Sequence, residues 1–266
     1  MRRRELSTVK LASSATVDSL QRGLDVLRCF HPGDEILSAT EIARRLTIPV
    51  QTALRIMDTL EDAGFLRHFA GTDNFSLHDE CQFLGQAFLS SSTLVRKARP
   101  ILQTFADRFD VHALVCVPDH LSMMVLLCIS SDSLQPLQLG PGFLLPIGSS
   151  AFGHAWLWRQ DGALQDEWLL RLCKEELASS GNSHITQIRK SFYDLEESGI
   201  CITASDSRDG FSMMATPLVL ENEATAALGC LEVSSRWTEV SSRAEIGVAL
   251  RETADSIHNV LRSARF

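Results

Sequence analysis

The sequence predicts an α+β protein with a small helical domain at the N-terminus and a larger domain built on a mostly antiparallel sheet. Residues 18–64 contain three short segments whose apolar residues recur at helical spacing. After residue 110, short segments with the alternation of strands are interspersed with helical ones. Strands in this order, with helices at both ends, favour an α+β domain.

Length and composition set the outer limits. A chain of 266 residues with 45% hydrophobic residues can fill a core in each of two domains. The seven cysteines form no CxxC pair, which indicates neither a disulfide framework nor a zinc cluster and favours a reducing cytosol. No apolar run has the length of a signal peptide or a membrane span, so we expect no membrane association and a disordered tail over residues 1–17.

The net charge of -8 is unevenly distributed. Residues 1–78 carry equal numbers of basic and acidic side chains, so the whole acidic excess lies after residue 78. A neutral front and an acidic remainder suit a molecule that presents one end to a polyanion and keeps the other end away from it.

Near the start of residues 18–78, the segment "SLQRGLDVLRCF" predicts a helix, with Asp18 or Ser19 expected as its N-cap. The turn-forming segment "HPGDE" ends this helix. Ser38 and Glu41 have the spacing of a capping box at the start of a short second helix, "ATEIARRL". In the third helix Pro49 is expected in the first turn and Gly64 as the C-cap. The apolar stripe of the third helix consists of Ala53, Ile56, Met57 and Leu60.

Packing of that stripe turns the polar side of the third helix outward near its N-terminal end, where it can enter a major groove. The segment "FLRHFAGTDNFSLH" has two short alternations around a turn and predicts a hairpin, which in this position forms a wing. Residues 18–78 therefore predict a winged helix-turn-helix that binds double-stranded DNA. The residues expected at the DNA are Ser38, Thr40, Arg44, Arg45, Gln51, Thr52, Arg55, Arg67 and His68.

Residues 79–93 predict a linker helix with Phe83, Leu84, Ala87 and Phe88 on one face. No neighbouring segment offers a packing partner, so we expect the helix to pair with its copy in a dimer.

Residues 94–266 predict the larger domain. A first helix, "LVRKARPILQTFADRF", is expected to bend or restart at Pro100. The expected strands are two in "VHALVCVPDHLSMMVLLCIS", then "SLQPLQLG", "GICITA", "FSMMATPLVL" and "AALGCLEVS". Further helices are expected in "SSAFGHAWLW", "DEWLLRLCKEEL", "ITQIRKSFYDLEES" and the C-terminal segment. Ser149 and Ser150 precede a helix, where free N–H groups can hold a carboxylate, although an ordinary N-cap explains them equally well.

An enzyme would need a recognisable catalytic constellation. "GSSAFG" is not GxSxG, and the eight histidines show no metal-binding spacing. Asp119 and His120 fall in a predicted turn facing solvent, and Cys201 on a strand is more often a small core residue than a nucleophile. We therefore expect no catalytic residue, no metal and no cofactor.

The chain resembles IclR-type bacterial transcription regulators along nearly its whole length. The resemblance is carried by "SLQRGLDVLRCF", "LSATEIARRLTIPVQTALRIMDTLEDAGFLR", "LPIGSSAFGHAWL" and "ESGICITASDSRDGFSMMATPL". It implies a GAF-like C-terminal domain that binds a small organic effector, commonly a carboxylate from a catabolic pathway, and a homodimer or homotetramer on a palindromic operator. The effector site that it implies, together with the two serines above, is Ser149, Ser150, Ala151, Phe152, Thr203, Met213, Gly229 and Leu231.

The chain also departs from the family pattern. The family's Lys is His154 here, its His-Ala before the serine is Gly148-Ser149, and its paired acidic residues appear as Ser205-Asp206. A site lined by apolar side chains favours a less polar, aromatic effector. The departures also keep open an alternative, in which the C-terminal domain only assembles the DNA-binding heads and binds no effector.

Overall fold

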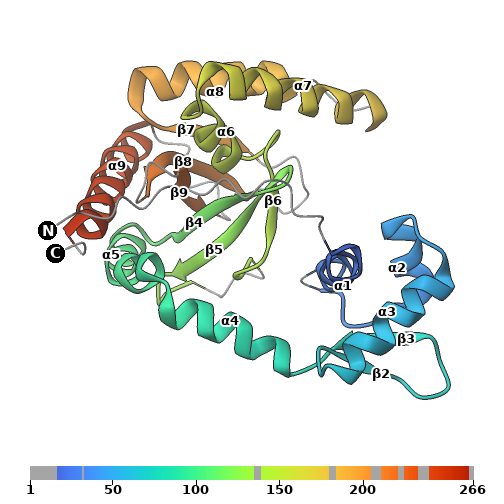
Figure 1. The fold of residues 1–266 in the computed structure, drawn as a ribbon. Helices are drawn as coiled ribbons and strands as arrows, with labels where there is room; N and C mark the ends of the chain where they lie inside the picture. Colours follow the sequence, from blue (N-terminus) through green and yellow to red (C-terminus); the bar gives the residue numbers. More distant parts are fainter. Residues whose placement is uncertain are drawn as a thin grey trace, which may run out of the picture. The chain divides into compact units, whose positions relative to one another are not determined.

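The computed structural model describes residues 17–31, 33–134, 139–179, 184–204, 211–220, 225–232 and 240–263. The chain divides into two compact units between Gln86 and Ala87, within helix α4 (Figure 1). The order of elements confirms the predicted α+β class, with helices followed by a hairpin in the first unit and a six-stranded sheet in the second.

The first unit is a three-helix domain with a small sheet. Its elements are α1 (Asp18–Arg28), β1 (Leu37–Ser38), α2 (Ala39–Leu46), α3 (Val50–Asp62), β2 (Leu66–His68) and β3 (Asn74–Leu77). The core is closed by apolar residues from all three helices and the hairpin, with Val26, Ile42, Met57 and Phe75 fully buried. The expected hairpin is present, and the two-residue strand β1, which the sequence did not indicate, adds to its β3 edge.

Helix boundaries differ by a residue from those expected. Val17, with no side-chain hydrogen bond, is the N-cap of α1, so Asp18 is the first helical residue rather than a cap. Pro49 precedes α3 in an extended conformation instead of lying in its first turn, because its carbonyl accepts the first hydrogen bonds of the helix. Gly64 follows α3 with a φ of 82°, which confirms its role in ending the helix.

The second unit has one antiparallel sheet in the order β6-β5-β4-β9-β8-β7. Its strands are β4 (His112–Asp119), β5 (Ser122–Ser130), β6 (Leu144–Pro146), β7 (Cys201–Ala204), β8 (Ser212–Val219) and β9 (Thr225–Glu232). Helices α5 (Thr93–Phe109) and α9 (Val240–Ser263) pack on one face of the sheet. Helices α6 (Ala151–Trp158), α7 (Gly162–Ser179) and α8 (His184–Ser198) lie toward the other face, against which α6 packs directly (Figure 1).

One expectation for this unit was wrong in part, and a second falls partly outside the described residues. Helix α5 runs through Pro100 without the restart that was one of the two expected outcomes, because buried Ala98, Leu102 and Phe105 hold it on the sheet on both sides of the proline. The segment "SLQPLQLG" lies partly outside the described residues, and its described positions form no strand; the edge strand is β6 instead.

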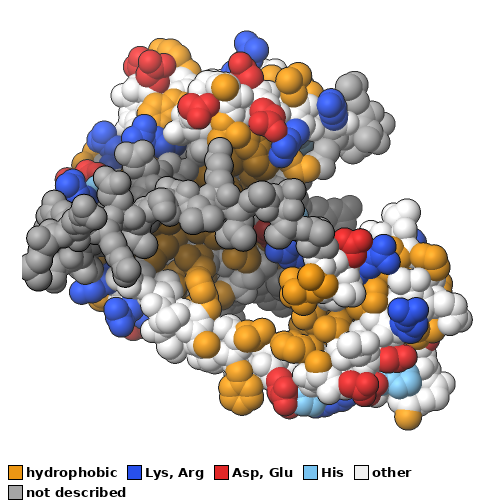
Figure 2. Space-filling view, viewed as in Figure 1, with side chains coloured by type: hydrophobic (Ala, Val, Ile, Leu, Met, Phe, Trp, Pro, Cys, Tyr) orange, Lys and Arg blue, Asp and Glu red, His pale blue; other side chains and the backbone are white. Residues whose placement is uncertain are grey.

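Helix α4 (Glu80–Ser91) lies within the predicted linker and is separated from α5 by Ser92. None of its side chains is buried, and Phe83, Leu84 and Phe88 are 73%, 61% and 50% exposed. Hydrophobic side chains are accordingly visible along α4 in Figure 2.

Candidate DNA-binding surface and ligand site

Helix α3 presents a polar stripe to solvent. Buried Ala53 and Met57 fix its orientation, which leaves Gln51 and Arg55 exposed and Thr52 half-buried. The first turn of α3 contains no acidic residue. Because a helix N-terminus also carries partial positive charge, this end of α3 suits an approaching polyanion.

The start of α2 is fixed by two of the predicted DNA-binding residues. Ser38 Oγ accepts a hydrogen bond from the Glu41 N–H at 3.1 Å and caps the helix as expected. Thr40 Oγ1 donates to Asp73 Oδ2 at 3.2 Å, and the Ala39 N–H donates to the Asp73 carbonyl at 2.8 Å. These bonds hold the turn of the wing against the N-terminus of α2.

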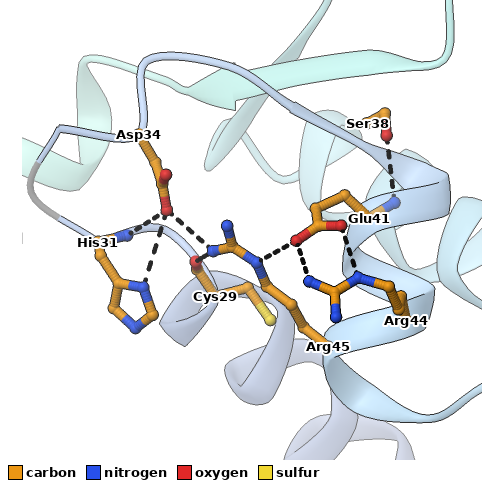
Figure 3. Close-up of polar contacts among 7 residues, drawn as sticks. All are labelled: Cys29, His31, Asp34, Ser38, Glu41, Arg44 and Arg45. Carbon is orange, nitrogen blue, oxygen red and sulfur yellow. Dashed lines mark hydrogen bonds and ion pairs between the residues drawn. The ribbon is translucent and has the colours of Figure 1, made fainter.

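Arg44 and Arg45 occupy different environments, although both contact Glu41 (Figure 3). Arg44 donates from Nε and Nη2 to the two oxygens of Glu41, at 2.9 and 2.7 Å, and 72% of its side chain is exposed. Hydrogen bonds from Arg44 and then Arg45 lower the pKa of Glu41 to about 2, so the carboxylate is ionised at neutral pH.

Arg45 is bonded on several sides. Its Nε donates to Glu41 at 2.8 Å, and its Nη1 donates to the Cys29 carbonyl at 2.7 Å and to Asp34 Oδ2 at 2.9 Å. Only 27% of its side chain is exposed. Arg45 therefore connects the end of α1 and the following loop to α2, whereas Arg44 offers the more accessible cation.

The wing carries the remaining two predicted residues. Arg67 is exposed and lies 3.6 Å from Asp79 through Nη2. His68 Nε2 is 2.7 Å from the carbonyl of Thr72, so Nε2 is the protonated nitrogen and donates this bond. The His68 ring also stacks on Phe75 at 4.6 Å between ring centroids, which gives His68 a part in closing the hairpin.

The residues expected at the effector meet where the N-terminus of α6 faces β7, β8 and β9. Ser150 Oγ accepts from the Gly153 N–H at 3.1 Å as the N-cap of α6. Thr203 Oγ1, on β7, accepts from the Ala151 N–H at 3.0 Å. Phe152, Met213 and Leu231 belong to the same buried cluster, Gly229 contacts Phe152, and Ser149 is half-buried beside Ser150.

His154, which replaces the family's Lys, has a place that the sequence did not reveal. It is fully buried; Nε2 lies 2.9 Å from the Gly148 carbonyl and Nδ1 lies 2.8 Å from Ser191 Oγ. A carbonyl only accepts, so Nε2 carries the proton and Nδ1 accepts from the serine. Burial lowers the pKa of His154 to about 4, which leaves the ring neutral at physiological pH. Ser191 lies on α8 and could not be connected to His154 from spacing alone.

The residues considered as catalytic candidates, Asp119, His120 and Cys201, do not come together in a site. Asp119 ends β4 and His120 lies exposed in the turn that follows. Cys201 is fully buried, and burial raises the pKa of its thiol. Within the described ranges, no group of three or more histidine, cysteine or acidic side chains is arranged to hold a metal ion, and no helix has the length and hydropathy needed to cross a bilayer.

Comparison with known proteins identifies the N-terminal domain and shows what the whole chain is similar to. Residues 19–68 match the IclR helix-turn-helix domain. The HTH-type transcriptional regulator TsaQ1/TsaQ2 of Comamonas testosteroni is 23% identical over 258 residues, covering 96% of this chain and 92% of the relative. An IclR family transcriptional regulator from Brucella abortus has a TM-score of 0.80 and 28% identity, covering 94% of this chain and 93% of that structure.

A third similar structure is that of an IclR homolog from Microbacterium hydrocarbonoxydans complexed with 4-hydroxybenzoate, with a TM-score of 0.67 and 21% identity, covering 92% of this chain and 99% of that one. At this identity the likeness concerns the fold. The relatives are transcriptional regulators, not enzymes, which decides between the two classes weighed from the sequence. The N-terminal unit thus contains an IclR helix-turn-helix domain, and the chain along nearly its whole length is similar to IclR-type transcriptional regulators.

Proposed function

We propose that this regulator binds a palindromic operator as a homodimer or homotetramer in the cytoplasm and controls a catabolic operon. The observation that carries the DNA-binding part is the exposed stripe of Gln51 and Arg55 at the acid-free N-terminal end of α3, beside the wing. In this arrangement Gln51, Thr52 and Arg55 read base edges, and Arg44 and Arg67 contact phosphates.

Control is exerted by a small organic effector, a carboxylate of aromatic character, in the C-terminal unit. The residues assigned to its site are largely apolar, and three of them, Phe152, Met213 and Leu231, belong to one buried cluster. An aromatic ring suits such surroundings better than a compact polar acid, which would lose hydration there without gaining enough partners. The 4-hydroxybenzoate complex of the Microbacterium homolog supports this choice of ligand class.

The close packing of these residues also favours an alternative, in which the C-terminal unit binds no effector and serves assembly alone. Thermal shift of the purified protein against a panel of aromatic and aliphatic acids separates the two, because a ligand that binds only the folded state raises the melting temperature. An acid that raises it supports control by an effector; a flat response across the panel favours the assembly function.

The DNA-binding function is tested by selecting sequences from a random duplex library with the full-length protein and footprinting the enriched site. We expect an inverted repeat, with protection of the two halves on one side of the duplex. Adding the acid that raises the melting temperature should change the affinity for this site. Enrichment of no sequence over random duplex would contradict sequence-specific regulation.

A further inference from the structure

We propose that Phe152 and Thr203 hold the effector site closed by making the contacts that a ring-bearing carboxylate would make, so that the effector binds by displacing them. This inference rests on the effector-controlled function proposed above.

The register of β7, β8 and β9 places two rows of side chains on the face of the sheet where one aromatic ring can pack. Thr203, Met213 and Leu231 are direct partners across β7, β8 and β9 and form one row. Two residues along each strand, a second row on the same face consists of Cys201, Ala215 and Gly229. The side chains of the second row are small, so they rise less far above the backbone of the sheet than those of the first row and leave space over it.

The ring of Phe152 lies over the end of this second row. A Cβ atom added to Gly229 would lie 2.6 Å from Cε1 and 2.8 Å from Cζ of Phe152, closer than carbon atoms approach. Phe152 is fully buried on the first turn of α6. The absence of a side chain at position 229 is thus what admits the ring.

The N-terminus of α6 is satisfied by side-chain hydroxyls next to that ring. Thr203 Oγ1 accepts from the N–H of Ala151, and Ser150 Oγ accepts from the N–H of Gly153. The Ala151 amide is one of the donors that a helix N-terminus offers to an anion. The threonine hydroxyl therefore occupies the position of a carboxylate oxygen, adjacent to a phenyl ring in the position of the effector's ring.

An aromatic acid carries both groups in one molecule. It can accept from the Ala151 N–H in place of Thr203 and cover the small-residue row in place of Phe152. Because the site is open only when Phe152 has moved, the apparent affinity is the intrinsic affinity reduced by the open fraction. Phe152 then sets both the affinity and the size of ligand that the site accepts.

The test compares Phe152→Ala with Phe105→Ala by titration calorimetry, with 4-hydroxybenzoate and phenol as probes. Phe105 is also a buried phenylalanine, only 4% exposed, but it belongs to the cluster on the opposite face of the sheet, so its truncation controls for any newly made cavity. We expect Phe152→Ala to bind 4-hydroxybenzoate at least about tenfold more tightly than the unaltered protein, with no gain in Phe105→Ala. Phenol, which lacks the carboxylate, should bind Phe152→Ala more weakly than 4-hydroxybenzoate.

An unchanged or lower affinity of Phe152→Ala overturns the inference, as does an equal gain in Phe105→Ala or equal binding of phenol. If Phe152→Ala does not fold, as judged by circular dichroism, Phe152→Leu replaces it and a smaller gain in the same order is expected. Operator binding is measured for the same variants. Release of the operator by an acid in the unaltered protein, with no affinity gain in Phe152→Ala, overturns the closed-site inference while supporting the proposed function.

Discussion

Glu41 holds the guanidinium of Arg44 through two hydrogen bonds, from Nε at 2.9 Å and from Nη2 at 2.7 Å. This pairing fixes one edge of an exposed side chain and directs the rest of the guanidinium toward solvent, where a phosphate can approach. Arg44→Ala should lower the magnitude of the slope of log K against log salt by about 1, because one phosphate contact is lost. Operator affinity measured at several salt concentrations gives this slope.

The neighbouring Arg45 provides the internal control for this experiment. Since Arg45 connects Cys29, Asp34 and Glu41, Arg45→Ala should lower the melting temperature of the N-terminal unit more than Arg44→Ala does. Equal salt slopes for the unaltered protein and Arg44→Ala would show that Arg44 contacts no phosphate.

Arg55 lies on the outward stripe of α3 and is expected to read a base edge. Arg55→Ala should weaken binding to the selected operator by about 1 to 3 kcal/mol and leave binding to random duplex nearly unchanged, because the lost bond is specific to one base pair. The two affinities are measured by fluorescence anisotropy at fixed salt. Arg99→Ala, which removes an exposed arginine from the C-terminal unit, is the matched control. A uniform loss on both duplexes would place Arg55 on the backbone instead.

Helix α4 exposes Phe83 and Phe88, which the described residues leave 73% and 50% accessible. Leu84, next to Phe83 in the sequence, lines a groove of about 560 Å³ with residues of α1 and α3, so the N-terminal unit carries both an apolar groove and an exposed ring. A two-fold interface joins identical patches and needs such self-complementarity. Phe83→Ser should raise the dimer dissociation constant at least about tenfold in sedimentation equilibrium.

The control for this prediction is Leu170→Ser, because Leu170 is a similarly exposed apolar residue on α7, at 63%. We expect it to leave association unchanged, and both variants to melt near the unaltered protein, since neither removes a buried group. Association unaffected by Phe83→Ser would assign the dimer contact to another surface.

Local signals made the helices of the N-terminal unit predictable. The Ser38 cap, the apolar stripe of α3 and Gly64 each act within a few residues of one another, so spacing alone reveals them. Strand β1 could not be foreseen, because two residues form a strand only through pairing with β3, far along the chain. The same holds for the bond between Thr40 and Asp73, which depends on where the wing turn lies.

The proposed effector site shows the same division between what local spacing reveals and what the fold decides. The resemblance pointed to its residues, but their arrangement in two rows follows from the strand register, which no local pattern specifies. From the sequence, the helix after Ser149 and Ser150 was expected to have free N–H groups. In the fold Thr203 accepts a hydrogen bond from one of these groups, and this contact depends on strand pairing that local spacing does not reveal.

Buried His154 makes stability depend on pH. Its pKa is about 4 in the folded protein against an ordinary value of 6.5, so between these values the unfolded chain binds more protons. The stabilisation from the neutral ring is therefore complete above about pH 6.5 and is lost as the pH falls toward 4, by up to about 3 kcal/mol. His112, whose pKa burial also lowers, acts in the same direction.

The variant His154→Gln removes this titration. Urea unfolding followed between pH 7.5 and 4 should give a lower free energy of unfolding at pH 7.5 than in the unaltered protein, because the bonds to Gly148 and Ser191 are disturbed. Below pH 6.5 the free energy of unfolding of His154→Gln should also fall less steeply with pH than that of the unaltered protein. His120→Gln, in the exposed turn after β4, is the control and should keep the unaltered slope. If His154→Gln loses stability with falling pH as steeply as the unaltered protein, a group other than His154 governs the acid response.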